Sequence, residues 1–267
     1  MRRRQRLSLR KHIVFESRIT NGARADFDRN GVVVIHGFFT PDETGELKDN
    51  LHRYMDEVVP KIPPRYVFYQ DKKRSSDPDS LLRLEWMNEH DPYYDRLRMR
   101  LMGVAEALLG EPVIPKQAEM FEKAPRFGEP TPPHQDGFYF MLEPNAAVTL
   151  WIPLERADEE NGCVRYVRNS HKRGMRNHEL SGVFGFSLGI TDYGPEDEGR
   201  ELIAAVEAGD LVAHHAMTIH RTDANASDRT RRAMGLIYWA ASSRQDIKGA
   251  RVHEERIHKQ WKEGGDL

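Results

Sequence analysis

The stretch AAVTLWIPL, residues 146–154, is a short run of β-branched, aromatic and aliphatic side chains, and it indicates a β-strand. Turn-forming residues separate it from four further runs of the same kind, which are GCVRYV (162–167), ELIAAV (201–206), GDLVAHH (209–215) and RRAMGLIYWA (231–240). Many short strands between turns are typical of a β-sandwich or a β-barrel. The second half of the chain therefore predicts a compact all-β unit.

The first part of the chain has a different pattern. GVVVIHGFF (31–39) predicts one buried strand that an Asn-Gly pair opens. A capping box of Thr40 and Glu43 then starts an amphipathic helix over about 40–59. Apolar residues at helical spacing predict a second helix over about 91–109, which stops at a glycine.

We expect a single domain over residues 1–267, because no internal repeat or low-complexity linker divides the chain. Its N-terminal part, about 1–111, is predicted to be helical around the one strand. The β-barrel core is expected over about 112–242, followed by a C-terminal tail at 243–267. Within the helical part, KKRSSDPDS (72–80) is predicted to be a polar surface loop.

The composition excludes several classes of protein. The 40 basic and 42 acidic residues give a formal net charge of −2, which argues against a nucleic-acid binder. The one cysteine, Cys163, excludes an internal disulfide or a CxxC metal site and favours a cytoplasmic location. No segment approaches the roughly 20 apolar residues of a membrane helix. The basic N-terminus, MRRRQRLSLRKH, precedes no apolar run and is expected to be a solvated tail.

The stretch PPHQDGFYF, residues 132–140, places His134 and Asp136 two residues apart, on one face if the stretch is a strand. Two imidazoles and one carboxylate on a metal leave the opposite positions open, as in non-haem Fe(II) oxygenases. Taken alone, the pair is also compatible with a polar turn after two prolines. A metal site needs a further donor, and the candidates are the downstream histidines His171, His178, His214, His215 and His220.

Five segments in this order resemble the phytanoyl-CoA dioxygenase family of Fe(II)- and 2-oxoglutarate-dependent oxygenases. They are GVVVIHGFFTPDE, PTPPHQD, TLWIPLERADEENGCVRYVRNSHKRG, GDLVAHHAMTIHRT and NASDRTRRA. The resemblance implies a mainly β fold with flanking helices, built on a double-stranded β-helix, which is a jelly-roll or cupin-like barrel. It also implies that His134, Asp136 and His220 are the iron ligands.

The same resemblance places an arginine eleven residues after the distal histidine, where Arg231 binds the far carboxylate of 2-oxoglutarate. Its planar guanidinium matches a carboxylate in a bidentate manner. Arg229 and Arg232 are expected to be surface charges, and Arg232 should point to the opposite strand face. Further cosubstrate-binding candidates are Thr222, Gln117, Lys123 and Thr149.

The activity that the resemblance implies is hydroxylation of an unactivated C–H bond of a small-molecule metabolite. It uses Fe(II), 2-oxoglutarate and O2, and it releases succinate and CO2. The carboxylate of Asp136 resembles the hydroxylating branch, because related halogenases have a small residue there. Candidates for the substrate pocket are Phe138, Phe140, Arg83 and Trp86.

Two other classes of function are compatible with the residues. One is a non-redox metal-dependent enzyme of the cupin type, in which Arg231 would have no reason to face the metal. The other is a catalytically silent protein that binds a metal or a ligand. No partner other than a small molecule is expected, neither a nucleic acid nor a membrane, and the sequence indicates no particular oligomeric state.

Overall fold

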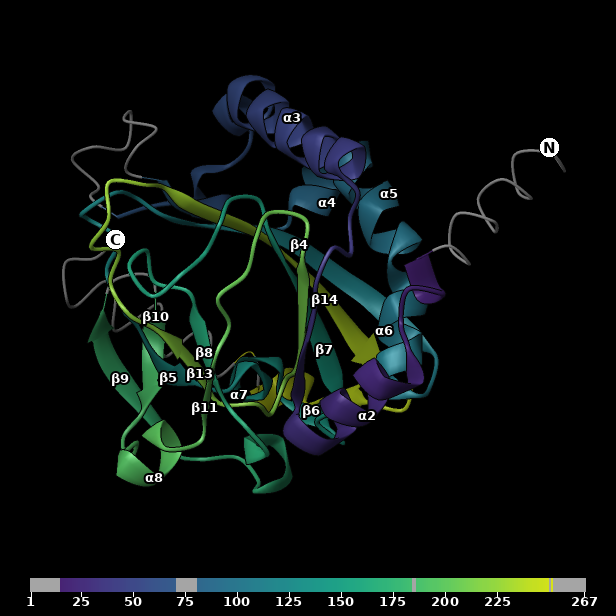
Figure 1. The fold of residues 1–267 in the computed structure, drawn as a ribbon, viewed down its shortest axis with the longest axis vertical. Coiled ribbons are helices and arrows are strands. Elements are labelled where there is room, and N and C mark those ends of the chain that lie inside the picture. The colour runs from purple at the N-terminus through teal and green to yellow at the C-terminus, as the bar shows by residue number, and fades with distance from the viewer. Residues whose placement is uncertain (1–14, 71–80, 184–185, 250, 252–267) are drawn as a thin grey trace, which may run out of the picture.

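The computed structural model describes residues 15–70, 81–183, 186–249 and 251, and Figure 1 shows the arrangement of their helices and strands. The predicted basic N-terminal tail, the loop at 72–80 and most of the C-terminal tail lie outside the described residues. No helix in the described part of the chain has the length and apolar character that crossing a membrane would require.

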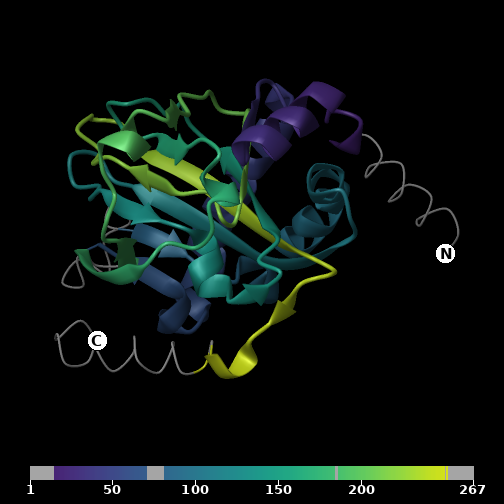
Figure 2. The ribbon, with the colours of Figure 1, turned by 90° about the horizontal axis from the view of Figure 1, so that it is seen from below.

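The larger of two main sheets has seven antiparallel strands within the described residues, in the order β1-β12-β7-β14-β4-β3-β2. The yellow-green strand β14 lies at its middle and crosses the centre of the molecule (Figure 2). The strands of this sheet are β1 (Val32–Ile35), β2 (Val67–Tyr69), β3 (Leu81–Leu84), β4 (Val113–Lys123), β7 (Ala147–Pro153), β12 (Leu211–His215) and β14 (Arg231–Ala240).

The smaller sheet has the order β11-β8-β13-β5 in the described part of the chain, and two strand pairs accompany it. Its strands are β5 (Thr131–His134), β8 (Val164–Val167), β11 (Glu201–Ile203) and β13 (His220–Thr222). The pairs are β9 (His178–Val183) with β10 (Phe186–Ile190), and β6 (Leu142–Glu143) with β15 (Arg244–Gln245). The mainly β, jelly-roll prediction is confirmed.

Helices cover the outer face of the larger sheet (Figure 1). Within the described residues, those that contribute to the main hydrophobic core are α2 (Asn21–Asn30), α3 (Pro41–Glu57), α4 (Met87–His90), α5 (Pro92–Arg100) and α6 (Met102–Leu109). Two further short helices, α7 (Asp136–Phe140) and α8 (Pro195–Glu198), contribute no residue to it. Short 3-10 turns lie at η1 (Val59–Lys61), η2 (Pro64–Tyr66) and η5 (Ser170–Lys172).

The two predicted N-terminal helices are present, with one difference. The capping box of Thr40 and Glu43 starts α3, with both reciprocal hydrogen bonds formed. The helix expected over 91–109 is divided into α5 and α6, because Leu101 has φ −97° and ψ 0°, outside the helical range. The second of these helices ends at Gly110, whose φ of 77° is the left-handed conformation that suits glycine.

The strand expected over 31–39 ends at Ile35, because a turn follows it. Gly37 has a φ of 61°, and its N–H donates to Asp210 Oδ1 at 2.8 Å. This strand joins the larger sheet beside β12, and β2 and β3 extend the same sheet from its opposite edge. The N-terminal part of the chain therefore supplies edge strands to the barrel as well as its helical cover.

The alternation of side chains along the larger sheet separates a packing face from a functional face. On β14, the side chains of Met234, Leu236 and Tyr238 join the main hydrophobic core with the helices. The intervening positions, which begin with Arg231 and Ala233, point to the other side, where the smaller sheet lies. The space between the two sheets receives the candidate site.

Candidate active site

His134 and His220 lie opposite each other on β5 and β13, where the strand register pairs them directly. Each ring is hydrogen-bonded through Nδ1 to the carbonyl oxygen two residues earlier, Pro132 at 2.9 Å and Thr218 at 3.0 Å. A carbonyl oxygen can only accept, so each Nδ1 carries the proton and each Nε2 keeps a free lone pair. Both imidazoles are thus held in the tautomer that binds a metal through Nε2.

Asp136 lies just beyond β5, at the first position of α7. Gln135 between the two candidate ligands stays extended, with φ −120° and ψ 123°, so the carboxylate returns to the side of His134. Asp136 Oδ1 is 3.6 Å from Nε2 of His134 and 3.6 Å from Nε2 of His220. One ligand atom from each of the three residues lies within 4.8 Å of the others, so the structure brings the three predicted ligands together.

The second carboxylate oxygen of Asp136 is held by two donors. Its Oδ2 accepts hydrogen bonds from Thr149 Oγ1 and from His214 Nε2, each at 3.1 Å. Burial alone would raise the pKa of this carboxyl group, but His220, His134 and His214 hold it well below its usual range. Asp136 is therefore an oriented carboxylate with Oδ1 directed at the two imidazoles.

Burial, followed by repulsion from His134, lowers the pKa of His220 well below its usual value. The ring is thus neutral at physiological pH, and a neutral imidazole is the form that ligates a metal. Two neutral imidazoles and one carboxylate form the donor set expected of a divalent transition metal with open positions.

Gln135 connects the metal-binding edge to the loop before β9. The residue is fully buried, and its side-chain amide donates to the carbonyl oxygens of Gly174 and Met217 at 3.1 and 2.8 Å. Its backbone N–H donates to Nε2 of His178 at 3.0 Å, and burial lowers the pKa of that histidine to about 4. His178 therefore supports the backbone between the two ligands and does not join them.

The other candidate histidines have different surroundings. His214 bonds the distal oxygen of Asp136, so it orients a ligand. His215 points to the opposite face of β12 and packs against Phe27 of α2, with ring centroids 6.3 Å apart. His171 lies 3.3 Å from the carbonyl oxygen of Asp28 through Nε2. The alternation of side chains along β12 is what separates His214 from His215.

Arg231 is a buried cation on the inner face of β14. Its side chain is 4% exposed and makes no hydrogen bond or ion pair with any described residue, and its Nε is buried without a partner. Its guanidinium lies 5.6 Å from the ring centre of Trp151, which is two residues beyond Thr149 on β7. Burial lowers its pKa to about 10, so the group is still charged at neutral pH.

Two other predicted cosubstrate residues lie close to this arginine. Lys123 is paired directly with Arg231 in the register of β4 and β14, and it is 2% exposed. Its Nζ donates to the carbonyl oxygen of Glu129. Burial, and then repulsion from Arg231, hold the pKa of Lys123 well below its usual value. Thr222 is buried on the face of His220, and its hydroxyl accepts from the backbone N–H of Thr131 at 3.1 Å.

A polar group lies further along β4 on the same inner face. Gln117 donates its side-chain amide to Glu119, which is 6% exposed. Burial, followed by repulsion from Glu85, raises the pKa of Glu119 to about 8. Arg83 forms an ion pair with Glu85 at 2.8 Å. Glu119 belongs to no motif that the sequence analysis identified, and the alternation of polar and apolar residues over 117–120 is the signal that could have placed it.

The aromatic candidates for the substrate pocket are all half-buried, and they have different neighbours. Phe138 stacks on His178 with ring centroids 4.3 Å apart, so it is next to the metal-binding edge. Phe140 packs against Trp239, with ring centroids 6.0 Å apart. Trp86 directly precedes α4 and has a φ of 53°.

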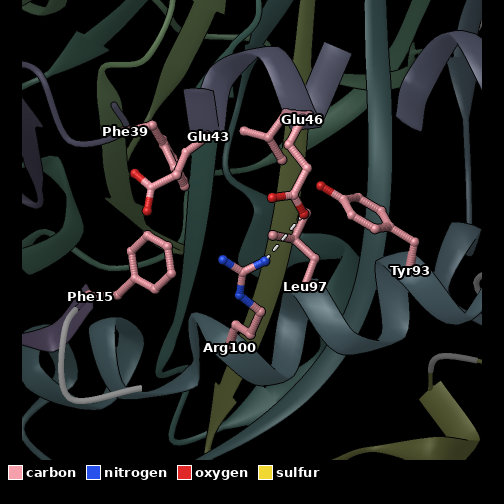
Figure 3. Close-up of a pocket in the computed structure, with 8 residues that line it drawn as sticks. Phe15, Phe39, Glu43, Glu46, Tyr93, Leu97 and Arg100 are labelled. Carbon is pink, nitrogen blue, oxygen red and sulfur yellow. Dashed lines mark hydrogen bonds and ion pairs between the residues drawn. The ribbon is translucent and has the colours of Figure 1, made fainter. Parts of the chain in front are cut away.

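A separate small pocket lies in the helical layer, between α3 and α5 (Figure 3). Its space of about 10 Å³ suffices for about one water molecule. Its charged groups already have partners, since Glu43 pairs with Arg18 at 2.9 Å and Glu46 with Arg100 at 3.5 Å. The cluster of His134, Asp136 and His220 is therefore the better candidate for an active site.

The sequence of this chain matches a known protein family and individual members of it. The family model described as phytanoyl-CoA dioxygenase (PhyH) matches residues 27–233. The peroxisomal phytanoyl-CoA dioxygenase of Mus musculus is 25% identical over 253 residues, which cover 90% of this chain and 73% of the relative. A phytanoyl-CoA dioxygenase domain-containing protein 1 homolog of Caenorhabditis elegans is 23% identical over 254 residues, covering 79% and 87%.

Solved structures share the fold. The α-ketoglutarate-dependent carbocyclase SnoK from nogalamycin biosynthesis has a TM-score of 0.69 at 22% identity, covering 90% of this chain and 92% of its own. EctD from S. alaskensis, solved with 2-oxoglutarate and 5-hydroxyectoine, has a TM-score of 0.69 at 19% identity, covering 86% and 79%. The epimerase SnoN, in complex with Fe3+, α-ketoglutarate and nogalamycin RO, has a TM-score of 0.67 at 22% identity, covering 85% and 87%.

Proposed function

Since this chain belongs to the phytanoyl-CoA dioxygenase family and is an Fe(II)- and 2-oxoglutarate-dependent oxygenase, we propose that it hydroxylates an unactivated C–H bond of a small-molecule metabolite. The observation that carries the proposal is the pairing of two features on facing strands. One is the cluster of two neutral imidazoles and a carboxylate, and the other is a buried guanidinium without an anionic partner among the described residues.

The iron ligands in this proposal are Nε2 of His134, Nε2 of His220 and Oδ1 of Asp136. The two backbone carbonyls behind the rings and the two donors on Asp136 Oδ2 support this assignment, because each ligand atom is already oriented toward a common point. Three protein ligands on one side of the ion leave room for the cosubstrate and O2.

Arg231 is proposed to bind the distal carboxylate of 2-oxoglutarate. An unpaired buried cation is unfavourable, so a carboxylate that reaches it gains a charge-assisted, bidentate contact in a dry environment. Lys123 lies directly opposite Arg231 on the adjacent strand, and Thr222 lies on the same side as His220. Gln117 and Thr149 complete the proposed cosubstrate site, Thr149 through its bond to Asp136.

The bound iron supplies O2 activation coupled to the oxidative decarboxylation of 2-oxoglutarate, in which one oxygen atom enters succinate and the other enters the C–H bond. The protein's own residues position the reactants and exclude water. The walls of the site around Tyr166, Trp151 and Ala233 are apolar and buried, which protects such a reaction from competing hydrolysis and proton leakage.

We propose that the substrate is a small molecule, as are the ligands named for SnoN and EctD. Phe138 beside His178, and Arg83 with Trp86 near the inner face of β4, are the residues we assign to its pocket. Phe140 is assigned to the same pocket only through its neighbour Phe138.

A screen of metabolites, with anaerobically loaded Fe(II) enzyme and 2-oxoglutarate, tests the proposal. We expect one class of compound to cause equal consumption of O2 and release of succinate. With 18O2 as the oxidant, one labelled atom should appear in succinate and one in the product. Turnover of a compound without O2 consumption would contradict the oxygenase chemistry, and an unlabelled product with labelled succinate would contradict hydroxylation alone.

A further inference from the structure

Tyr166 of β8 is a buried tyrosine next to His220, one of the three residues of the proposed metal site. The register pairs it directly with His220, and its side chain is completely buried. Its ring stacks on that of His220, with centroids 5.6 Å apart and an interplanar angle of 27°. Its centroid is also 5.1 Å from that of His214. The phenol is therefore a wall of the space next to the proposed iron ligands.

The hydroxyl group of Tyr166 has no hydrogen-bond partner among the described residues. Buried tyrosine hydroxyls normally find a partner, and a buried polar group without one is destabilising. Burial and then Asp136 raise the pKa of the phenol, whereas Arg231 lowers it. Both the carboxylate of the proposed metal site and the proposed cosubstrate-binding cation therefore act on this hydroxyl.

Arg231 presents the second unpartnered group of the same space, its Nε. Trp151 joins the two, since Tyr166 and Trp151 belong to one hydrophobic cluster and the guanidinium of Arg231 lies 5.6 Å from the Trp151 ring. Two buried donors without a hydrogen-bond partner among the described residues, one charged and one neutral, thus lie around the Trp151 ring. A carboxylate has about four lone-pair sites, so one group can satisfy a bidentate arginine and a phenol together.

We propose that the Tyr166 hydroxyl donates a hydrogen bond to the distal carboxylate of 2-oxoglutarate, alongside Arg231. This inference rests on the proposed function, because it assigns a further residue to the same cosubstrate site. Tyr166 is a positioning residue here: it helps to fix the far end of the cosubstrate, while the near end is fixed at the metal. This role belongs to the hydroxyl group, and the ring separately stacks on His220.

The test removes the hydroxyl alone, in Tyr166→Phe, and measures anaerobic binding of 2-oxoglutarate to the Fe(II) enzyme by the charge-transfer absorption of the chelate. A hydrogen bond to a charged group predicts that the Kd rises about tenfold or more. The Fe(II) affinity and the unfolding temperature without 2-oxoglutarate should stay at the wild-type values. Tyr54→Phe is the matched control, because its hydroxyl is also buried without a partner but lies in the helical layer.

A second ligand locates the contact. 2-Oxobutyrate retains the keto acid but lacks the distal carboxylate, so wild type and Tyr166→Phe should bind it equally. An unchanged 2-oxoglutarate Kd in Tyr166→Phe would overturn the inference, and so would an equal loss with 2-oxobutyrate or an equal loss in Tyr54→Phe. Failure of the wild type itself to bind 2-oxoglutarate would instead refute the proposed function on which the inference rests.

Discussion

Arg231 and Arg232 are neighbours on β14 with opposite surroundings. Arg232 points to the outer face, where its Nε donates to Glu122 at 2.6 Å and its backbone N–H donates to Glu155 at 2.8 Å. Arg231 points to the inner face and has no carboxylate partner in the described residues. A shift of one position along the strand thus exchanges an arginine whose charge is paired with a carboxylate for one whose charge has no such partner among the described residues.

A structural arginine can be distinguished from a ligand-binding one by whether a carboxylate of the protein pairs with its guanidinium. A buried charge that the fold itself requires is paired, because an unpaired one costs several kcal/mol by rough estimate. Arg229 also follows the structural pattern, with Asp158 at 2.8 Å and Glu160 at 3.2 Å. Arg231 departs from this pattern, and its guanidinium instead lies over Trp151 on the inner face of the sheet. Four predictions test this contrast, beginning with the cluster itself.

Asp136→Ala should abolish turnover. It removes the only anionic ligand of the cluster, and two imidazoles alone hold Fe(II) weakly. Equilibrium dialysis with Fe(II) under anaerobic conditions should show the loss of tight binding, and succinate release with a substrate should disappear. Asp210→Asn is a suitable control, because Asp210 is a buried carboxyl group that binds the turn after β1, outside the cluster. Full retention of Fe(II) by Asp136→Ala would contradict the ligand assignment.

Arg231→Leu should raise the Kd for 2-oxoglutarate by about 100-fold or more, since truncating such a charge pair costs roughly 2–5 kcal/mol. Fe(II) affinity should be nearly unchanged. Without 2-oxoglutarate, the free energy of unfolding should stay the same or increase, because an unpaired buried charge is replaced by an apolar side chain. Anaerobic titration and denaturant unfolding measure the two quantities. A large loss of stability with an unchanged Kd for 2-oxoglutarate would mean that Arg231 has a structural role and does not bind the cosubstrate.

Arg232→Leu should have the converse effect. It leaves Glu122, whose side chain is 1% exposed, without its cationic partner. We expect a loss of about 3 kcal/mol in the free energy of unfolding, measured with urea, and an unchanged Kd for 2-oxoglutarate. Arg229→Leu, at a more exposed ion pair, should cost less than about 1 kcal/mol. Weakened cosubstrate binding in Arg232→Leu would show that the face of the strand does not decide the role.

Thr149→Val should produce the smallest change. It removes one of the two hydrogen bonds to Asp136 Oδ2 at nearly constant volume and leaves His214 in place. Loss of such a supporting contact typically lowers metal affinity by about tenfold. We expect that decrease in Fe(II) affinity, measured by anaerobic competition with a chelator. An effect as large as that of Asp136→Ala would mean that Thr149 does more than orient the carboxylate.

Several features follow from the sequence alone. Thr40 and Glu43 specify the start of α3, because the capping hydrogen bonds involve only residues three apart. The β-rich runs at 146–154 and 231–240 specify strands through their composition, and alternation places Arg231 and Arg232 on opposite faces. The family motifs add the assignment of the proposed iron ligands, which the spacing of His134 and Asp136 leaves open by itself.

Other features depend on the tertiary structure. The sequence offers five candidate histidines after Asp136 for the third metal ligand. The pairing of β13 with β5 brings His220 to His134, whereas His215 packs against Phe27 of α2. The roles of His214 and Gln135, and the proposed role of Tyr166, likewise depend on strand pairing and on contacts between distant segments. Local sequence determines the conformation of a strand and its two faces, because these depend on near neighbours. Which donor meets which acceptor across the barrel depends on register and on contacts between distant segments, and so does whether a buried charge finds a partner.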